Sequence, residues 1–128
     1  MEVSKLMTQP VRRIDEDATI LDASNLMSRE RVGSLIVTRR GRDIGIVTEK
    51  DIISKVTARN GDARKIKVKE IMSTPLIKVD KNADAEDAVR IMAENDVRRV
   101  AVTDYGKIIG IFSTGDVTKL VQLAQSAQ

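Results

Sequence analysis

The sequence contains no cysteine and no histidine, and these two absences exclude several classes of chemistry. Without cysteine there is no disulfide, no thiolate nucleophile and no cysteine zinc site. Without histidine there is no imidazole base, no Ser-His-Asp triad and no histidine metal ligand. Aspartate and lysine could perform acid–base chemistry in principle, but no cluster of such residues suggests it. We therefore expect a protein that is not an enzyme and that carries no metal.

Aromatic residues and long apolar runs are also scarce. The sequence has no tryptophan, and Tyr105 and Phe112 are its two aromatic residues, which argues against a base-stacking platform. No apolar run approaches the roughly 20 residues that cross a membrane. The first ten residues have no apolar signal core. We expect a cytoplasmic protein with no membrane partner.

Charged residues are numerous, but the net charge is small. Of the 128 residues, 22 are basic and 19 are acidic, so the net charge is +3, with +2 in residues 1–64 and +1 in residues 65–128. This mild and even excess does not demand a nucleic-acid partner. Nucleic-acid binding through the basic residues near the chain centre and through Arg39, Arg40 and Arg42 stays open, and it would weaken steeply with salt.

The sequence is two copies of one unit. A shift of 65 positions aligns residues 3–56 with residues 68–121 without a gap, and 17 of the 54 aligned pairs are identical. A match of this length is hard to assign to chance, so the repeat determines the predicted architecture. The identical pairs include Pro10/Pro75, Asp15/Asp80, Ala23/Ala88, Met27/Met92, Gly41/Gly106, Gly45/Gly110 and Asp51/Asp116.

Both copies have the same predicted order of elements, βαββα. A strand follows the proline, which biases the chain toward an extended entry. An amphipathic helix comes next, then two strands joined by a tight turn in which Gly41 or Gly106 can adopt a positive φ, and then a second helix. The predicted strands are 11–14, 34–38 and 43–48 in the first copy and 76–79, 99–103 and 108–113 in the second.

A copy of about 50 residues buries too little apolar surface to be stable alone. We therefore predict an α/β (α+β) fold with two βαββα repeats packed sheet-to-sheet and related by pseudo-twofold symmetry. The predicted domains are residues 1–61 and 68–128, with a polar linker over 57–67. Short helical turns are expected over 68–74 and over the matching residues 3–9. The basic residues around the linker are interpreted as a solvated connection: Arg59, Arg64, Lys65, Lys67 and Lys69.

The most informative segments are the two strand-to-helix corners, GIVTEKD and GIFSTGD. In each, an apolar strand ends at a hydroxyl residue, and an aspartate follows three residues later in the first turn of a helix. Thr48 with Asp51, and Ser113 with Asp116, have the spacing of a capping box. These residues therefore stabilise a helix start on the simplest interpretation.

The corners also have the chemistry of a nucleotide site. A helix start favours an anion such as phosphate, and a hydroxyl there can donate to a phosphate oxygen. The nearby carboxylate can accept two hydrogen bonds from the vicinal hydroxyls of a ribose, and a glycine in the strand permits close approach of a ligand. Thr19 and Asp22 have the same spacing at another helix start, so spacing alone does not separate a ligand site from a cap.

On these features the chain resembles a pair of cystathionine-β-synthase (CBS) domains, the Bateman module. The resemblance is carried by the tandem βαββα units, the repeated G-h-h-[ST]-x-x-D (h, apolar) and the segments KLMTQP and EIMSTP, and it covers roughly residues 3–123. It implies two clefts between the repeats that bind adenosine-containing ligands. Such ligands are AMP, ADP, ATP, S-adenosylmethionine or NAD(H), acting as regulatory ligands rather than cofactors.

The resemblance implies a role for particular residues. Asp51 and Asp116 match the ribose-binding aspartate, and Thr48 and Ser113 match the hydroxyl residue near phosphate and ribose. Arg98 and Arg99 resemble the basic pair that reaches phosphates in kinase-regulating γ subunits, and Lys50 adds positive charge beside Asp51. The implied base-pocket residues are Ala18, Val32, Gly33, Ile46, Ala83, Val97 and Ile111.

In this family each site combines the aspartate corner of one repeat with the second strand of the other. The first implied site joins Ser113, Asp116 and Ile111 with Ala18, Val32 and Gly33. The second joins Thr48, Asp51 and Ile46 with Ala83, Val97 and Arg98. Because Arg98 stands where the first site has Gly33, the two sites are expected to differ.

The resemblance thus implies a stand-alone sensor that binds an adenine nucleotide, forms a homodimer and acts on an effector protein. The helices that carry Leu26, Met27, Leu120 and Leu123 are candidates for the dimer contact. The alternative is an interaction or dimerisation module with unoccupied clefts, in which the corner residues are only helix caps. A weak nucleic-acid binder also stays open.

Overall fold

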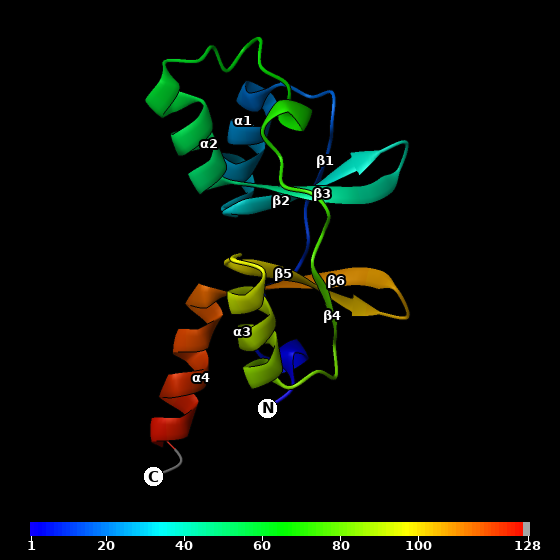
Figure 1. Ribbon diagram of the computed structural model, residues 1–128, viewed down its shortest axis with the longest axis vertical. Coiled ribbons are helices and arrows are strands. Elements are labelled where there is room, and N and C mark those ends of the chain that lie inside the picture. The colour runs from blue at the N-terminus through cyan, green and yellow to red at the C-terminus, as the bar shows by residue number, and fades with distance from the viewer. Residues whose placement is uncertain (127–128) are drawn as a thin grey trace. The chain divides into compact units, whose positions relative to one another are not determined.

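The computed structural model, which describes residues 1–126, contains two three-stranded sheets with two α-helices on each (Figure 1). The first sheet has the order β1-β2-β3, with β1 parallel to β2 and β2 antiparallel to β3. Its strands are β1 (Arg13–Asp15), β2 (Ser34–Arg39) and β3 (Arg42–Thr48), and its helices are α1 (Ile20–Glu30) and α2 (Glu49–Lys55).

The second sheet repeats this arrangement in the order β4-β5-β6. Its strands are β4 (Lys78–Asp80), β5 (Arg99–Asp104) and β6 (Lys107–Ser113), and its helices are α3 (Ala85–Glu94) and α4 (Thr114–Ser126). The predicted βαββα order is confirmed in both copies, as is the mixed α/β fold class. The packing of one sheet against the other stays a prediction.

Both hairpins turn through two consecutive residues with positive φ. Arg40 and Gly41 have φ values of 51° and 77°, and Tyr105 and Gly106 have values of 49° and 78°. Two such residues in succession form a type I′ turn, whose twist matches that of the flanking strands. The predicted positive φ of the two glycines is confirmed.

The first strand of each copy begins later than predicted. Pairing of β1 with β2 starts at Arg13, and that of β4 with β5 starts at Lys78. The residue before each strand contributes one hydrogen bond, from Ile36 N–H to the Arg12 carbonyl and from Ala101 N–H to the Ile77 carbonyl. Each parallel ladder therefore pairs three residues of one strand with three of the other.

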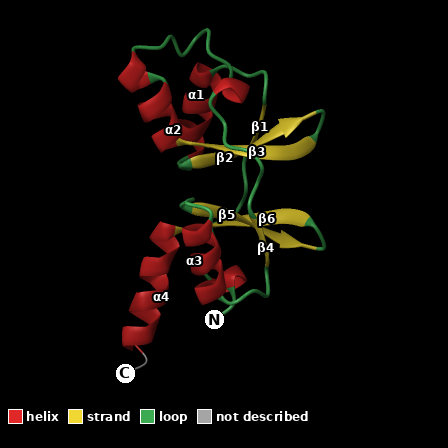
Figure 2. Cartoon of the chain, in the orientation of Figure 1, coloured by secondary structure: helices red, strands yellow, loops and turns green. Residues whose placement is uncertain are grey.

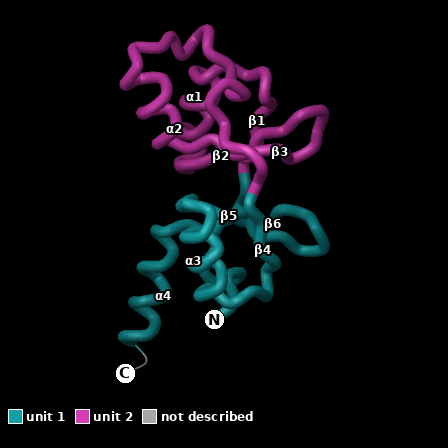
Figure 3. The backbone as a smooth tube through the Cα atoms, in the orientation of Figure 1, with its two compact units in different colours: residues 1–11, 77–128 teal, residues 12–76 magenta. Residues whose placement is uncertain are grey.

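The chain divides into two compact units whose boundaries do not follow the repeats (Figure 3). Unit 2 is Arg12–Leu76, and unit 1 joins Met1–Val11 to the chain from Ile77 onward. We call residues 1–11 the first arm and residues 66–76 the second arm. The first arm therefore folds with the second repeat, and the second arm folds with the first repeat.

Each arm carries the expected short helical turn, η1 (Val3–Lys5) or η3 (Val68–Glu70), and docks on the loop before the first helix of its unit. Val68 N–H donates to the Ala18 carbonyl at 2.8 Å, and Val3 N–H donates to the Ala83 carbonyl at 2.9 Å. The first residue of the helix also pairs with the arm, from Ile20 N–H to the Ile66 carbonyl. The arm thus satisfies a helix-start N–H that has no partner within the helix.

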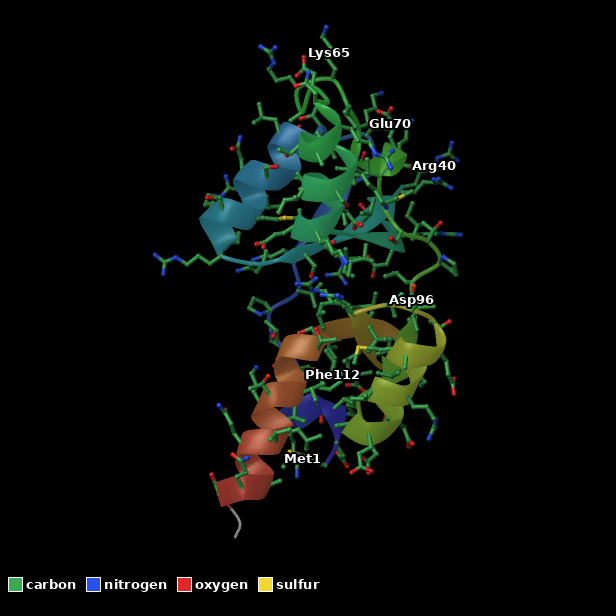
Figure 4. The ribbon with its side chains drawn as sticks, turned by 60° about the vertical axis from the view of Figure 1, so that its left-hand side comes forward. Met1, Arg40, Lys65, Glu70, Asp96 and Phe112 are labelled. Carbon is green, nitrogen blue, oxygen red and sulfur yellow. The ribbon has the colours of Figure 1, made fainter. Side chains whose placement is uncertain are left out.

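Both helices of a unit lie on one face of its sheet, and the arm completes the core between them (Figure 2). In unit 1, Phe112 is fully buried among apolar side chains of α3 and β5 (Figure 4). The arms contribute four buried side chains, Val3 and Leu6 to unit 1 and Val68 and Ile71 to unit 2. Burial of each such side chain stabilises by roughly 1.5–3 kcal/mol, so neither repeat has a full core without its arm.

Past the helical turn, each arm runs beside the last strand of its sheet. Ile46 and Ser73 exchange two backbone hydrogen bonds, of 3.1 and 2.9 Å, and Thr8 and Ile111 do the same at 2.8 and 3.1 Å. A Cβ on Gly45 would lie 2.7 Å from the Ser73 carbonyl oxygen. The close approach that the glycine permits is therefore that of the chain's own arm, whereas the sequence analysis assigned it to a ligand.

Ion pairs differ between the two arms. Lys69 Nζ lies 2.9 Å from Asp17 Oδ1, beside Glu16, which Arg39 binds through two nitrogens at 2.7 and 3.0 Å. In unit 1 the positions of Glu16 and Arg39 are taken by Lys81 and Asp104, which pair at 3.4 Å with reversed signs, and Ser4 stands in the place of Lys69. The second arm therefore presents lysines to an acidic loop, and Lys69 makes this ion pair while 45% of its side chain stays exposed to solvent.

The contact between Gly45 and the second arm predicts that Gly45→Ala destabilises the protein. Because the obstructing Ser73 oxygen belongs to the backbone, it cannot move cheaply, and we expect a loss of about 1–3 kcal/mol in the free energy of unfolding. Urea unfolding measures the loss. Gly115→Ala in α4 is the control, since its Cβ would have an ordinary 3.5 Å contact and alanine favours a helix. Equal stability of the two variants would contradict the docking.

The ion pairs predict a specific acid sensitivity. The hydrogen bond from Arg39 lowers the pKa of Glu16, and that from Lys69 lowers the pKa of Asp17. Both groups therefore stabilise the fold above the pKa of the unfolded chain, about 4, and this stabilisation is lost as the pH falls through their lower folded values.

The free energy of unfolding should thus fall between pH 6 and pH 3, and it should fall less in Asp17→Asn than in the unaltered protein. Urea titrations at both pH values measure the difference. Glu86→Gln, on the exposed face of α3, is the control for loss of one carboxylate. If Asp17→Asn keeps the full pH dependence, the Lys69 pair does not produce it.

Candidate ligand-binding site

The first Asp corner, Thr48 to Asp51, joins β3 to α2 as a complete capping box. Thr48 N–H donates to Asp51 Oδ2 at 3.0 Å, and Asp51 N–H donates to Thr48 Oγ1 at 3.1 Å. The side chain of Asp51 is 16% exposed. The predicted cap is confirmed, and it fixes a carboxylate that stays partly exposed to solvent.

The second Asp corner, Ser113 to Asp116, joins β6 to α4 with different hydrogen bonds. Asp116 Oδ2 accepts from Ser113 N–H at 2.9 Å and from Ser113 Oγ at 3.2 Å. The hydroxyl therefore donates to the carboxylate, whereas the Thr48 hydroxyl accepts from an amide. The side chain of Asp116 is only 4% exposed. The two corners, equivalent in sequence, thus differ in hydrogen bonding and in access.

Each aspartate also has a lysine partner that the sequence analysis missed. Lys55 Nζ lies 3.4 Å from Asp51 Oδ1, and Lys119 Nζ lies 2.8 Å from Asp116 Oδ1. The spacings are i, i+4 and i, i+3, which place both residues on one face of a helix. That spacing is the signal by which the pairs could have been found.

The start of the second strand is fixed to the corner of its own unit. Glu49 N–H donates to the Gly33 carbonyl, and Thr114 N–H donates to the Arg98 carbonyl, both at 3.0 Å. The predicted site residues Gly33 and Arg98 therefore lie at the start of α2 and α4 respectively. Their pairing with the corner of the other repeat stays a prediction.

The isoleucines of the implied base pocket lie on the face of the sheet away from the helices. Ile46 is paired with Ile36, and Ile111 with Ala101, while the neighbouring Val37 belongs to the helix-facing core. Successive residues of a strand point to opposite faces. The four other apolar positions pack against the cores of their own units: Ala18, Val32, Ala83 and Val97.

The cations implied for phosphate binding lie at the rims of the corners. Lys50 in α2 and Arg98 before β5 are exposed, and Arg99 in β5 is half-buried. No ion pair joins these three cations to another of the residues 1–126. They are therefore available to an anion.

The helices expected at a dimer contact differ in the side chains that they expose. Met27 is 4% exposed in the core of unit 2, and Leu26 and Leu120 are partly buried against the cores, so the dimer contact itself stays a prediction. Leu123 is 46% exposed.

Among the described residues no group of His, Cys, Asp or Glu could hold a metal ion, and no helix there has the length and apolar character to cross a membrane.

Comparisons with known proteins agree with this architecture. The CBS domain family matches residues 3–58 and again residues 68–123. The chain is 34% identical over 115 residues to the CBS domain-containing protein YhcV of Bacillus subtilis, covering 90% of this chain and 81% of YhcV. It is 32% identical to the mitochondrial protein CBSX3 of Arabidopsis thaliana, covering 82% of this chain and 53% of CBSX3.

Solved structures give the same result. The hexameric CBS-CP12 protein from bloom-forming cyanobacteria is 36% identical, with a TM-score of 0.86 over 92% of this chain and 69% of that one. A CBS-domain protein of Burkholderia ambifaria is 28% identical, with a TM-score of 0.84 over 94% of this chain and 93% of that one. CBS-domain proteins are regulatory and signal-transduction modules, and nucleotide binding is a general feature among them. The chain belongs to this family and consists of two CBS domains.

Proposed function

We propose that the chain is a regulatory module that binds an adenosine-containing ligand at its Asp corners. The observation that carries the proposal is that the chain builds this corner twice, each time with a carboxylate fixed beside an apolar strand. A fixed carboxylate can accept hydrogen bonds from both vicinal hydroxyls of a ribose. Ile46 and Ile111 provide apolar surface for a base on the same strands.

The charge around the corners favours a phosphate-bearing ligand. Lys50, Arg98 and Arg99 have no ion-pair partner among the described residues, and two of them are exposed. We assign them to the phosphates of AMP, ADP or ATP, with Thr48 and Ser113 near the ribose. S-adenosylmethionine, which carries no phosphate, would not use these cations. The ligand acts as a regulator, and its effect passes to an effector protein or to the oligomeric state.

One observation favours an interaction module without a ligand. Both oxygens of each Asp carboxylate already have partners in their own unit, and Asp116 is almost completely buried. On this alternative the corners only cap helices. A ribose must therefore share the carboxylate with these partners, which its four lone-pair positions allow.

We expect one or more of AMP, ADP, ATP, S-adenosylmethionine and NADH to stabilise the protein in thermal unfolding. At a ligand concentration 100-fold above the Kd, stabilisation is about 2.7 kcal/mol. We expect Asp51→Asn or Asp116→Asn to weaken binding at least about tenfold by calorimetry, which corresponds to about 1.4 kcal/mol. Asparagine keeps the size of the side chain but loses the charge that orders the diol.

Asp22→Asn is the matched control, because Thr19 and Asp22 form a capping box of the same geometry at the start of α1. It should cost stability without changing affinity. If no ligand of the panel acts at millimolar concentration, and Asp51→Asn behaves as Asp22→Asn does, the interaction module is the better description.

We also propose that the protein self-associates through its second helices. Ile53 on α2 is 61% exposed, and Val121 on α4 is 50% exposed. Ile53→Glu or Val121→Glu should therefore lower the sedimentation coefficient to that of a monomer. Leu21→Glu on α1, where the leucine is 41% exposed, is the control and should leave assembly unchanged. Monomers of the unaltered protein at high concentration would refute the proposal.

A further inference from the structure

We propose that Lys55 and Lys119 couple the two Asp corners to the docking of the two arms. Lys55 Nζ, 3.4 Å from Asp51 Oδ1, also donates to the Ile71 carbonyl at 3.0 Å. Lys119 Nζ, 2.8 Å from Asp116 Oδ1, also donates to the Leu6 carbonyl at 3.4 Å. Each ammonium group therefore joins a corner to an arm of the same unit.

The arm carbonyls are equivalent in the two units. Leu6 and Ile71 are the C-cap residues that directly follow the helical turns η1 and η3, and both side chains lie in the core of their unit. The last carbonyls of a helical turn have no partner within the turn, and a lysine is a common donor to them. The ammonium group thus holds the arm where it turns from the core toward the last strand.

The two lysines are not equivalent in the repeat. A shift of 65 residues places Lys55 opposite Leu120 and Lys119 opposite Ser54. Each lysine binds an aspartate and an arm carbonyl, and this agreement between the units does not follow from the duplication of one ancestral lysine. Two positions of the second helix, i+3 and i+4 from the aspartate, supply the same bridge in the two units. This agreement indicates that the bridge itself, rather than a general need for surface charge, determines where the lysine stands.

The bridge has a functional consequence that rests on the proposed ligand site. An ammonium group has three hydrogens, so it can bind the carboxylate and the carbonyl at once. The docked arm therefore fixes the position of the ammonium group beside Asp51 or Asp116. Coupling between two sites is reciprocal, so a ligand that uses the carboxylate stabilises the docked arm by the same factor. Lys55 and Lys119 are positioning residues for the ligand and a means of reporting its presence to the arms.

A double-mutant cycle without ligand tests the bridge. Thr8 N–H, which donates to the Ile111 carbonyl at 2.8 Å, reports arm docking through its hydrogen-exchange rate. Asp116→Asn should accelerate this exchange about threefold or more in the unaltered background, and should have no further effect in the Lys119→Met background. Lys78→Met, at an exposed lysine of the same unit, is the control background and should keep the full effect. Equal acceleration in all three backgrounds would overturn the bridge, because the cap alone would then carry it.

A second measurement repeats the exchange experiment in the presence of AMP or ATP. Nucleotide should slow exchange of Thr8 or of Ser73, the matching reporter in unit 2, and Lys119→Met or Lys55→Met should abolish this protection in its own unit. Protection that persists in the lysine variants would overturn the coupling. If the unaltered protein binds no nucleotide by calorimetry, the proposed function fails, while the ligand-free cycle still decides whether the bridge exists.

Discussion

The structure depends on the docking of each arm against the repeat that it does not precede. A three-stranded sheet with two helices on one face leaves an opening in its core, and Val3 with Leu6, or Val68 with Ile71, fills it. The same arm then pairs with the last strand of the sheet. Since apolar burial is the largest favourable term in folding, this docking makes each unit depend on residues from outside its own repeat.

Each Asp corner lies at the start of the second helix of its unit, and the lysine that binds its carboxylate also binds the docked arm. Its carboxylate caps a helix, binds a lysine and, on the proposed function, binds a sugar. One group can do all three because a carboxylate has more acceptor positions than a cap requires. The different access of Asp51 and Asp116, with side chains 16% and 4% exposed, makes the two corners unequal even though their sequences match.

Much of the fold could be predicted from the sequence, because its signals are local. The alternation and helical periodicity of apolar residues, the glycines at 41 and 106 and the 65-residue repeat all have direct structural meanings. The arm docking could not be predicted in this way. Val3 and Val68 occupy the same place in the repeat, so the apolar pattern does not say which sheet each arm covers. Charge does distinguish them, because Lys69 meets Asp17 whereas the matching residue of the first arm is Ser4.

The site was predicted in part for the same reason. Thr48 and Asp51 are neighbours in sequence, and their capping box was expected. Lys55 and Lys119 were missed because comparison of the repeats in register sets each beside an unrelated residue.

The balanced charge of the two sequence halves also hides a difference in net charge between the two units. Unit 2 has 14 basic and 10 acidic residues, a net charge of +4, and the remainder of the chain has 8 and 9, a net charge of −1.

The exchange of arms has a consequence for how such a chain can arise. A polypeptide with one copy of the repeat that kept this arrangement of arm and sheet would dock its arm on a second molecule and would therefore associate in pairs. Joining two copies through the segment after α2 makes that association intramolecular. The effective concentration of each arm then becomes about millimolar and no longer depends on how much protein the cell makes. A duplicated gene of this kind would gain stability at low expression before it gained any new contact.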